Sequence, residues 1–409
     1  MQEYITRSLE RKFAKLNKNF KCLLVTGARQ VGKTTMLEHL AENTNRTFVS
    51  LDDEDALSMA NQDPALFLQA FKPPVLIDEI QKAPKLFPAI KAHVDKHKQA
   101  GQVWMTGSQQ FLMMKNIQES LAGRVAILNL HSFSQRECAT KPNVDSIDLS
   151  FKNLSAKQNT AQENNIASTF EQIWTGGMPS VQGQDAEIRS EFFKSYVETY
   201  LMRDVSEVEG VRQWAKFRKF LVACASITAE QLNYAKLAEI VGITQPTAKQ
   251  WIDILVSMGI IFILAPYKNN RLKRLTKTPK LYFADTGLCA YLAKWPSAQT
   301  LMAGPMAGHY FENFVVSQLM KNACYSPYQH ELYYYRDWNG REIDLIIDDE
   351  FGLHPFEIKL SSNPKTSEVK KFSILDTSAH SYNSGGLICM CQRPLPIDGR
   401  NAYIPSNML

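Results

Sequence analysis

The sequence has few features that would cross-link the chain or tie it to a metal. Seven cysteines are scattered over 409 residues, and no two of them form a CxxC pair. An odd, scattered set argues against a disulfide framework and a zinc site, and it favours a reducing compartment. Cys389 and Cys391 stand close together within an apolar run, where two small residues of a strand are the simpler interpretation.

Long hydrophobic runs are also absent from the sequence. The longest, Ile254–Tyr267, is broken by Ser257 and Gly259 and is shorter than the roughly 18 residues that a membrane-spanning helix needs. The N-terminal segment Met1–Lys12 is charged and contains no apolar leader. We therefore expect a soluble, cytoplasmic protein without a membrane partner.

Charge of one sign is not in large excess either. The chain has 46 basic and 41 acidic residues, a net charge of +5, which is too weak to indicate a nucleic-acid partner by itself. Its 44% hydrophobic residues exclude an acidic disordered protein. At roughly 100–200 residues per domain, the length indicates about two to four domains.

A glycine-rich stretch near the N-terminus is the most informative motif that is present. It follows the strand-like run Cys22–Thr26, precedes a helical pattern, and fits G-x-x-x-x-G-K-[ST], the phosphate-binding loop. Lys33 would reach the β- and γ-phosphates of ATP, and the Thr34 hydroxyl would ligate Mg²⁺. The loop amides and the helix N-terminus favour bound phosphate, whereas a glycine-rich turn without a ligand is the alternative. The predicted nucleotide-binding residues are Gly27, Ala28, Arg29, Gln30, Val31, Gly32, Lys33, Thr34 and Thr35.

Two further strand ends fit a nucleotide site. The apolar run Pro74–Ile77 ends in Asp78 and Glu79, which we predict to hold Mg²⁺ and to activate the attacking water. The next strand-like run ends near Thr106 and Ser108, and either is a candidate sensor of the γ-phosphate; a turn that closes the strand is the alternative. Repeated strand–helix order predicts a parallel α/β sheet with ligands at the carboxyl ends of its strands.

Several stretches resemble the AAA-type P-loop ATPases that carry a C-terminal domain of unknown function numbered 4143. The shared stretches are GARQVGKTT (27–35), LDDEDA (51–56), IDEIQKAP (77–84), MTGSQQF (105–111), SLAGR (120–124), GGMPS (176–180), YLMRDV (200–205) and KTPKLYFADTGLCAYL (277–292). The resemblance spans nearly the whole chain, and it implies no particular biological role. It implies an α/β fold with an AAA-like P-loop ATPase core, a winged helix and a restriction-endonuclease-like C-terminal domain.

This organisation sets the domain boundaries that we expect. The ATPase core would occupy residues 1–135, and a helical lid residues 136–225, with a polar loop at 141–166. A winged-helix domain would occupy residues 226–295, and the nuclease-like domain residues 296–409.

Three residues between the core and the winged helix are candidates for contacts with the nucleotide. Pro179 belongs to a turn that resembles the one approaching the adenine in signal-transduction ATPases; a plain turn between helices is the alternative. Arg203, on a predicted helix over Glu191–Val208, would reach the γ-phosphate or pair with an acid. Arg124 would contact phosphate or brace the sheet.

A helix-turn-helix pattern follows. Asn233–Ile243 predicts a short helix ended by Gly242, and Thr244 would cap a second helix over Gln245–Met258. The second helix would read DNA, or the module would pack on the nucleotide domain instead.

A basic segment without acids comes next, at residues 268–280. We predict that it contacts double-stranded DNA; a solvated face is the alternative. Its cationic residues are Lys268, Arg271, Lys273, Arg274, Lys277 and Lys280.

The C-terminal region contains the order of charged residues found in PD-(D/E)xK nucleases. Asp344 lies in one predicted strand, and Glu357 and Lys359 lie on the same face of another. The carboxylates would bind Mg²⁺, with Glu312 as a further ligand, and the lysine would orient the attacking water. No proline directly precedes Asp344, which departs from the usual nuclease pattern. An inert fold with ion-paired side chains is the alternative.

The function that we expect from the sequence is ATP hydrolysis with Mg²⁺, coupled to the winged-helix and nuclease-like regions and carried out on or near nucleic acid. One alternative is a nucleotide-locked switch or scaffold with protein partners. The other is a Mg²⁺-dependent nuclease regulated by ATP. The sequence leaves protein partners and oligomeric state open.

Overall fold

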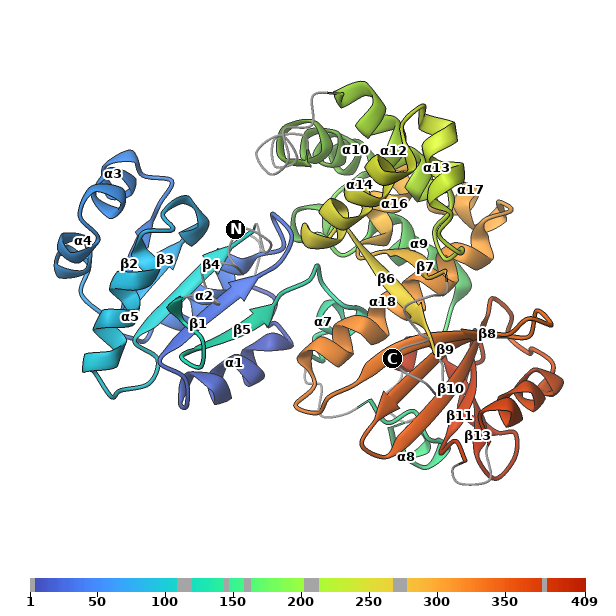
Figure 1. Cartoon of the computed structure of the whole chain (residues 1–409). Coiled ribbons are helices and arrows are strands. Elements are labelled where there is room, and N and C mark those ends of the chain that lie inside the picture. The colour runs from blue at the N-terminus through green and yellow to red at the C-terminus, as the bar shows by residue number, and fades with distance from the viewer. Residues whose placement is uncertain are drawn as a thin grey trace.

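The structure is a computed structural model that describes residues 4–108, 120–142, 147–157, 163–201, 213–267, 278–376 and 381–409. Figure 1 shows three parts: an N-terminal α/β unit, a group of helices, and a second sheet formed largely by the C-terminal residues. The helices among the described residues include none long and apolar enough to cross a membrane.

The N-terminal unit is built on a five-stranded parallel sheet. Its strands are β1 (Cys22–Thr26), β2 (Thr47–Ser50), β3 (Val75–Asp78), β4 (Val103–Gly107) and β5 (Val125–Asn129). They lie in the order β2-β3-β4-β1-β5, so that β4 separates the strand before the glycine-rich loop from the strand that ends in Asp78. The carboxyl ends of β1, β3 and β4 therefore share one edge.

Helices cover both faces of this sheet, which explains the continuous apolar strands. Leu23 and Val25 face one hydrophobic cluster, to which α1 and α2 contribute, whereas Leu24 faces a second cluster. The helices of this unit are α1 (Leu9–Asn17), α2 (Lys33–Ala41), α3 (Glu54–Gln62), α4 (Pro64–Ala70) and α5 (Leu86–Lys96), with a short 3₁₀ turn, η1 (Ile80–Lys82), directly after Glu79.

Helices fill most of the region from Gln135 to Tyr325. They are α7 (Gln135–Cys138), α8 (Phe151–Lys157), α9 (Ile166–Thr175), η3 (Pro179–Val181), α10 (Ala186–Ser195), η4 (Tyr196–Leu201), α12 (Trp214–Ser226), α13 (Tyr234–Val241), α14 (Gln245–Ser257), α16 (Thr286–Leu292), α17 (Ala298–Ala303) and α18 (Ala307–Tyr325).

Two expectations about this region are corrected. The predicted polar loop at 141–166 contains helix α8, whose Leu154 is buried in the core, and its last residue begins α9. Leu149 is buried in the same cluster, so apolar side chains anchor a segment that its composition marked as a loop. The helix predicted over Glu191–Val208 begins earlier, as α10, and continues through the wider π-helical turn η4; residues 202–212 lie outside the described ranges.

The helix-turn-helix elements predicted from the sequence are present. Asn233 accepts a hydrogen bond from the Lys236 amide at the start of α13, and Gly242 ends that helix with a left-handed φ of 73°. Thr244 then caps α14 by accepting the Thr247 amide. Side-chain caps at both helix starts and glycine at the turn explain why the pattern was readable.

The second sheet has eight strands in the order β12-β13-β11-β10-β9-β8-β6-β7. Their bounds are β6 (Ile261–Pro266), β7 (Lys280–Phe283), β8 (Glu331–Arg336), β9 (Glu342–Asp349), β10 (Gly352–Lys359), β11 (Gly385–Cys389), β12 (Leu395–Pro396) and β13 (Asn401–Pro405), with 3₁₀ turns η5 (Thr366–Leu375) and η6 (Ser406–Met408). Helix α18 packs against β7 and β10.

This sheet crosses the boundary that we expected between residues 295 and 296. β6 pairs with β7 in a hairpin and also pairs in parallel with β8, where Ala265 lies opposite Tyr333. The Tyr267 amide extends the ladder by donating to the Tyr334 carbonyl at 2.6 Å. Without β8, one side of β6 would have unpaired amides and carbonyls, because β7 pairs only with the other side. β8 pairs with part of that free side.

Candidate functional site

The glycine-rich loop joins β1 to α2 and requires glycine at both ends. Gly27 has a φ of 143°, and a Cβ at this position would lie 2.0 Å from the Leu130 carbonyl oxygen. Gly32 has a φ of 92° and leads directly into α2. The loop therefore adopts a backbone that other residues would strain, with the N-terminus of α2 at its end.

Lys33 is folded into this loop. The residue is 6% exposed, and its Nζ donates to the carbonyl oxygens of Gly27 at 3.1 Å and Ala28 at 2.8 Å. Its ammonium thus lies inside the curve of the loop, where the sequence predicts the phosphates.

Asp78, at the end of β3, lies beside the loop. Its Oδ1 accepts hydrogen bonds from the hydroxyls of Thr34 and Thr106, each at 2.6 Å. Ser50, at the end of β2, donates to Oδ2 at 3.4 Å. Ser50 was not among the predicted residues, although its position at a strand end was the available signal.

Glu79 follows with an unusual backbone. Its φ of 58° is left-handed, and its amide donates to the Thr106 hydroxyl at 3.0 Å. Its carboxylate accepts a hydrogen bond from Gln81, and Ser108 donates to it at 3.5 Å. Thr106 and Ser108 therefore contact the two acids of this site, and Gln81 is a neighbour that the sequence reading missed.

Two turns from other parts of the chain lie against the loop. A Cβ at Gly32 would be 3.9 Å from Pro179 Cγ, so Pro179 is beside the loop. A Cβ at Gly259, in the turn after α14, would be 3.5 Å from the Ala28 amide nitrogen. The guanidinium of Arg29 lies over the Tyr200 ring at 5.7 Å, and the predicted Arg203 lies outside the described residues.

Arg7 is a further residue beside the loop that the sequence reading missed. Its guanidinium donates to the Val31 carbonyl at 2.7 Å and to the His131 carbonyl at 2.6 Å, and it pairs with the buried Glu137 at 3.1 Å. Glu137 forms a capping box with Ser134. The Ser-x-x-Glu spacing was the only sequence signal for this arrangement.

Arg124 braces the N-terminal unit. Its guanidinium makes two hydrogen bonds to the Asp95 carboxylate, at 2.6 and 3.1 Å. This arrangement corresponds to the bracing alternative rather than to a phosphate contact.

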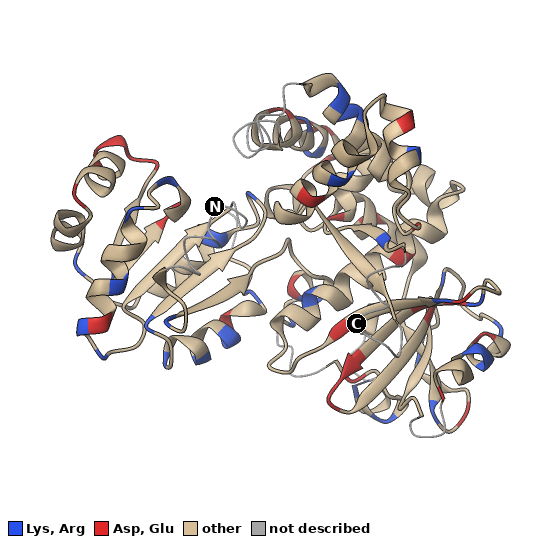
Figure 2. Ribbon diagram, viewed as in Figure 1, with Lys and Arg blue, Asp and Glu red and all other residues tan. Residues whose placement is uncertain are grey.

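A second group of charged side chains lies between α18 and the C-terminal sheet. Lys280 on β7 is 4% exposed, and its Nζ lies 2.9 Å from Glu312, 2.6 Å from Glu342 and 3.9 Å from Asp344. The Tyr282 hydroxyl also donates to Glu312 at 2.7 Å. Figure 2 shows acidic positions on neighbouring strands of this sheet.

Lys280 was predicted to contact DNA, and that prediction is wrong. Its ammonium is buried among three carboxylates, because β7 turns it away from solvent and towards α18. Five predicted DNA contacts lie outside the described residues: Lys268, Arg271, Lys273, Arg274 and Lys277.

The three residues of the nuclease-like pattern are brought together. Lys359 Nζ lies 2.6 Å from Glu357 and 3.7 Å from Asp344, and Lys371 approaches the other Glu357 oxygen at 2.6 Å. Asp344 also accepts a hydrogen bond from the Ile358 amide at 2.9 Å. Lys371 was missed because it lies in η5, outside the motif.

Burial changes the acidity of this group. Burial, reinforced by Asp344, raises the pKa of Glu312 to about 7, although Lys280 and Tyr282 oppose the shift. Burial and Asp344 likewise raise the pKa of Glu357 to about 7, against the effect of Lys359 and Lys371. In the described ranges, no group of three or more His, Cys, Asp or Glu side chains is arranged to hold a metal ion. Lysine ammonium groups contact the predicted metal ligands Glu312, Asp344 and Glu357 instead.

Three models of protein domains match parts of the chain. Residues 19–139 match the model of an AAA domain. This match covers the five-stranded sheet of the N-terminal unit and the glycine-rich loop. Residues 166–299 match a domain of unknown function, number 8612, and residues 307–409 match another, number 4143. The model for residues 166–299 spans both the predicted lid and the helix-turn-helix.

Relatives match most of the length of the chain. Uncharacterized proteins of Mycobacterium bovis and Mycobacterium tuberculosis are each 28% identical over 358 residues, which is 87% of this chain and 74% of theirs. An uncharacterized protein of Methanocaldococcus jannaschii is 22% identical over 374 residues, covering 86% of this chain and 78% of its own.

Two solved structures were also found to be similar. A Walker-type ATPase of Pyrococcus abyssi has a TM-score of 0.45 at 15% identity, covering 71% of this chain and 96% of its own. The RuvB Holliday junction branch migration motor of Thermotoga maritima has a TM-score of 0.30 at 17% identity, covering 66% and 91%.

Proposed function

We propose that the protein binds ATP with Mg²⁺ at the loop Gly27–Thr34 and hydrolyses it. The observation that carries the proposal is the convergence of Thr34, Asp78 and Glu79 at one edge of the sheet, with Thr34 Oγ1 2.6 Å from Asp78. A hydroxyl and a carboxylate at this separation supply the oxygen ligands that Mg²⁺ prefers. Mg²⁺ at this position would neutralise charge on the phosphates.

The loop is suited to phosphate in shape and charge. Its glycine backbone bends tightly around the position of the Lys33 ammonium, and α2 begins directly after it. When phosphate is bound, Lys33 would exchange its two carbonyl acceptors for phosphate oxygens. A cation, a helix N-terminus and loop amides together favour an anion of high charge.

Glu79 is the proposed base that orients and deprotonates the attacking water. Its left-handed backbone costs free energy, and strain of this kind is concentrated at functional sites. Thr106 supports both acids, because its hydroxyl donates to Asp78 and accepts the Glu79 amide. Gln81 and Ser108 hold the Glu79 carboxylate in place.

The nucleotide state is proposed to reach the other parts of the chain through contacts with the loop. Pro179 and Gly259 touch the loop from the two halves of the helical region, and Arg7 joins Val31 to Glu137. Arg203 remains a proposed γ-phosphate contact, from the same chain or from a neighbouring one.

Steady-state ATPase measurements test the proposal. We expect Lys33→Ala to lose ATP binding, and Glu79→Gln to keep binding while turnover falls about a hundredfold or more, as for removal of a general base. Lys15→Ala, at an exposed position of α1, is the matched control and should leave turnover unchanged. ATP turnover that persists in both site variants would contradict the catalytic roles given to Lys33 and Glu79. ATP binding without turnover in the natural protein would favour a nucleotide-locked switch.

Nucleic acid is the proposed macromolecular partner. The proposal is supported by two capped helices followed by the β6–β7 hairpin, which is the order of elements expected for a winged helix. Thr244, Gln245, Lys249 and Gln250 are exposed along the second helix. The proposed contacts with double-stranded DNA are these side chains and the basic residues of 268–277.

The salt dependence of DNA affinity tests this partner. Neutralising Lys273 and Arg274 should reduce the slope of log affinity against log salt by roughly one unit per lost phosphate contact. Neutralising Lys15 and Lys18 of the N-terminal unit is the control. An unchanged slope would mean that the segment makes no phosphate contacts.

A metal-dependent nuclease is the second candidate function, with a restriction-endonuclease-like fold for the C-terminal sheet. The observation that favours it is the approach of Lys359 to both Asp344 and Glu357. Plasmid cleavage with Mg²⁺ or Mn²⁺ tests it, with Asp344→Ala as the site variant and Glu350→Ala, at an exposed position between β9 and β10, as the control. Cleavage that survives in Asp344→Ala would come from another source.

A further inference from the structure

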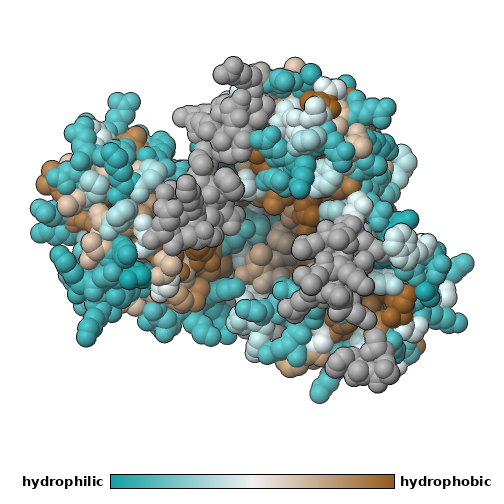
Figure 3. All heavy atoms as spheres, in the orientation of Figure 1, coloured by the Kyte–Doolittle hydropathy of each residue, from teal (hydrophilic) through white to brown (hydrophobic). Residues whose placement is uncertain are grey.

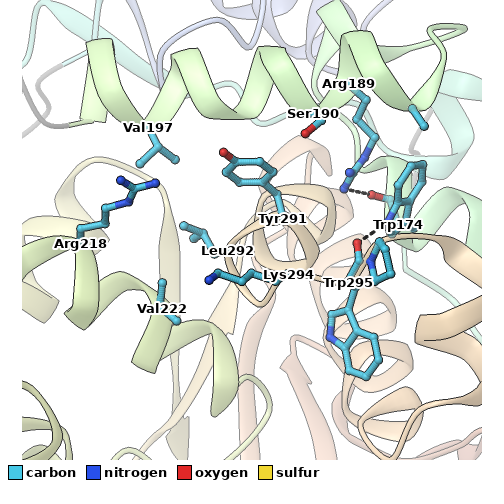
Figure 4. A pocket seen from close by; sticks show the side chains of 12 residues that line it. Trp174, Arg189, Ser190, Val197, Arg218, Val222, Tyr291, Leu292, Lys294 and Trp295 are labelled. Atoms are coloured by element: carbon cyan, nitrogen blue, oxygen red, sulfur yellow. Dashed lines mark hydrogen bonds between the residues drawn. The ribbon is translucent and has the colours of Figure 1, made fainter.

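A cavity of about 290 Å³ lies among the helices, apart from the nucleotide site and the lysine–carboxylate group. Figure 4 shows its walls, which come from α10, η4, α12, α16 and the residues that follow α16. It shares no residue with either site described above. A cavity of this size matches the lower end of the range for small-molecule pockets.

Arg189 is a buried cation in the wall of this cavity. The residue is 3% exposed, and its guanidinium lies over the Trp174 ring at 3.8 Å. Its Nη2 donates to the carbonyls of Trp174 and Gly287, but its Nε has no hydrogen-bond partner. Figure 4 shows the guanidinium between Trp174 and the cavity.

The charge of Arg189 is not balanced by a contacting acid. No carboxylate of the described chain lies within ion-pairing distance of it, and carbonyl oxygens are its only hydrogen-bond acceptors there. Burial lowers the pKa of Arg189 to about 10, although Asp285 and Glu171 oppose the shift. A buried cation is costly unless an anion nearby balances its charge.

Two more cations face the same cavity from its open side. Arg218 on α12 and Lys294 after α16 both line it and are exposed. Within the described ranges, Arg218 pairs with Glu198 at 3.9 Å, and both side chains are about half exposed. The lining residues in the described ranges include three cations and no acid, so the cavity favours an anionic ligand.

The remaining lining indicates what else the ligand carries. The Tyr291 ring lies between Arg189 and Arg218 in Figure 4, and Val197 and Val222 add apolar surface. Aromatic and aliphatic walls bind flat apolar groups, whereas the hydroxyls of Ser190 and Tyr291 offer hydrogen bonds at the rim. Inorganic phosphate alone would leave these walls unused.

We propose that this pocket binds a small organic anion in which a carboxylate or phosphate is attached to an aromatic group. The anionic group contacts the ammonium of Lys294 and the guanidinium of Arg218 at the exposed side, and the positive charge of Arg189 in the wall attracts it without direct contact. The ring packs against Tyr291 and the two valines. The site is independent of ATP turnover and stands whether or not the N-terminal unit hydrolyses ATP.

Binding of two simple probes by the full-length protein tests the proposal. The probes are benzoate and phenyl phosphate, with inorganic phosphate and benzyl alcohol as the charge-only and ring-only comparisons. Titration followed by ligand NMR and by tryptophan fluorescence gives the dissociation constants, with Mg-ADP present so that phosphate groups do not report on the glycine-rich loop. We expect millimolar or tighter binding of both probes and weaker binding of the two comparison compounds.

Variants at exposed positions test whether the probes bind in this pocket, because such changes leave the core intact. The double variant Arg218→Gln/Lys294→Gln should raise the dissociation constants roughly tenfold, because two charge-assisted contacts are lost. Lys219→Gln/Lys236→Gln removes the same charge from α12 and α13 outside the cavity and should change neither constant. Arg189→Met, checked for folding by circular dichroism, should weaken binding because the wall of the cavity loses its positive charge.

Three outcomes would overturn the proposal. They are no binding of either probe at millimolar concentration, equal affinity in both double variants, and inorganic phosphate binding as tightly as phenyl phosphate.

Discussion

Asp78 shows how single hydroxyl groups define the candidate ATPase site. Three hydroxyls, from Thr34, Thr106 and Ser50, point at its carboxylate from α2, β4 and β2. Only Thr34 belongs to the phosphate-binding motif. The position of β4 between β1 and β3 places Thr106 where it contacts both acids, so the support of the site depends on strand order.

Thr106→Val tests this support. The change keeps the shape of the side chain and removes the hydrogen bonds to Asp78 and to the Glu79 amide. We expect ATP turnover to fall by roughly 10–100-fold, the usual cost of losing a partner of a ligating carboxylate, with little change in ATP affinity. Thr106→Ser should restore most of the rate, and a full rate in Thr106→Val would show that the hydroxyl has no positioning role.

Glu312 makes the stability of the C-terminal part depend on pH. Its pKa is raised from 4.5 to about 7 in the folded protein, so the folded state binds its proton more tightly than the unfolded state does. The stabilisation is present below about pH 4.5 and is lost as the pH rises through about 7. The free energy of unfolding should therefore decrease over this window.

Urea unfolding across this pH window measures the effect in Glu312→Gln. The glutamine cannot ionise, so we expect its stability to vary less with pH than that of the natural protein. Glu239→Gln, an exposed change on α13, should leave the pH dependence unaltered. The same slope in all three proteins would contradict the role given to Glu312.

At the scale of elements, the helix-turn-helix was readable because its signals are local. Asn233 and Thr244 each accept a hydrogen bond from a backbone amide three residues later, and Gly242 ends α13 through its own backbone conformation. The start of α14 is an example: the Thr244 hydroxyl accepts a hydrogen bond from the Thr247 amide at 3.3 Å.

Thr244→Ala removes that cap. Loss of an N-cap costs about 1 kcal/mol, so amides in the first turn of α14 should exchange with solvent about fivefold faster. Hydrogen-exchange mass spectrometry of the peptide spanning α14 checks this. Thr44→Ala, in an exposed turn after α2, is the control, and unchanged exchange in Thr244→Ala would show that the cap adds nothing.

The β6–β7 hairpin shows where element-level reasoning failed. Its strands follow the helix-turn-helix in sequence and were assigned to that domain. In the structure β6 also joins β8, so the hairpin is the edge of the C-terminal sheet. Nothing local in Ile261–Pro266 marks its partner, because parallel pairing is set by where two distant strands are packed.

At the scale of the whole molecule, contacts with the glycine-rich loop tie the units together. Figure 3 shows apolar atoms in the hollow between the N-terminal unit and the other two parts. Arg7 joins Val31 to Glu137 there, and Lys12 donates to carbonyls of Cys324 and Ser326 at the end of α18.

Arg7→Met tests this connection. Removing one partner of a buried ion pair leaves Glu137 without its counter-charge, which costs about 3–5 kcal/mol. We expect a lower melting temperature and faster hydrogen exchange in α7, measured together on the full-length protein. Arg11→Met, at an exposed position of α1, is the control, and unchanged exchange in α7 would mean that Arg7 does not hold the units together.

What the sequence predicted best is what depends on neighbours along the chain. Three such features were predicted: the loop with Lys33, the strand ending in Asp78 and Glu79, and the caps of α13 and α14. Each is determined by residues that lie a few positions away in the sequence. The partners Ser50, Arg7 and Lys371 were missed because each reaches its site from another element. Gln81 and Glu342 were missed although they lie two residues from Glu79 and Asp344, because spacing alone does not show which side chain they contact. Lys280 was misassigned for the same reason: its positive charge was visible, but the three carboxylates around it were not.

The sequence alone determined that this chain contains a phosphate-binding loop in an α/β unit and a capped helix pair, since backbone geometry and short-range hydrogen bonds fix those features. Only the tertiary structure decided which charges meet. It buried Lys280 with Glu312 rather than exposing it, joined β6 to the C-terminal sheet, and left Arg189 facing a cavity. Burial makes an unpaired charge costly, and whether a charge is buried depends on how distant segments pack.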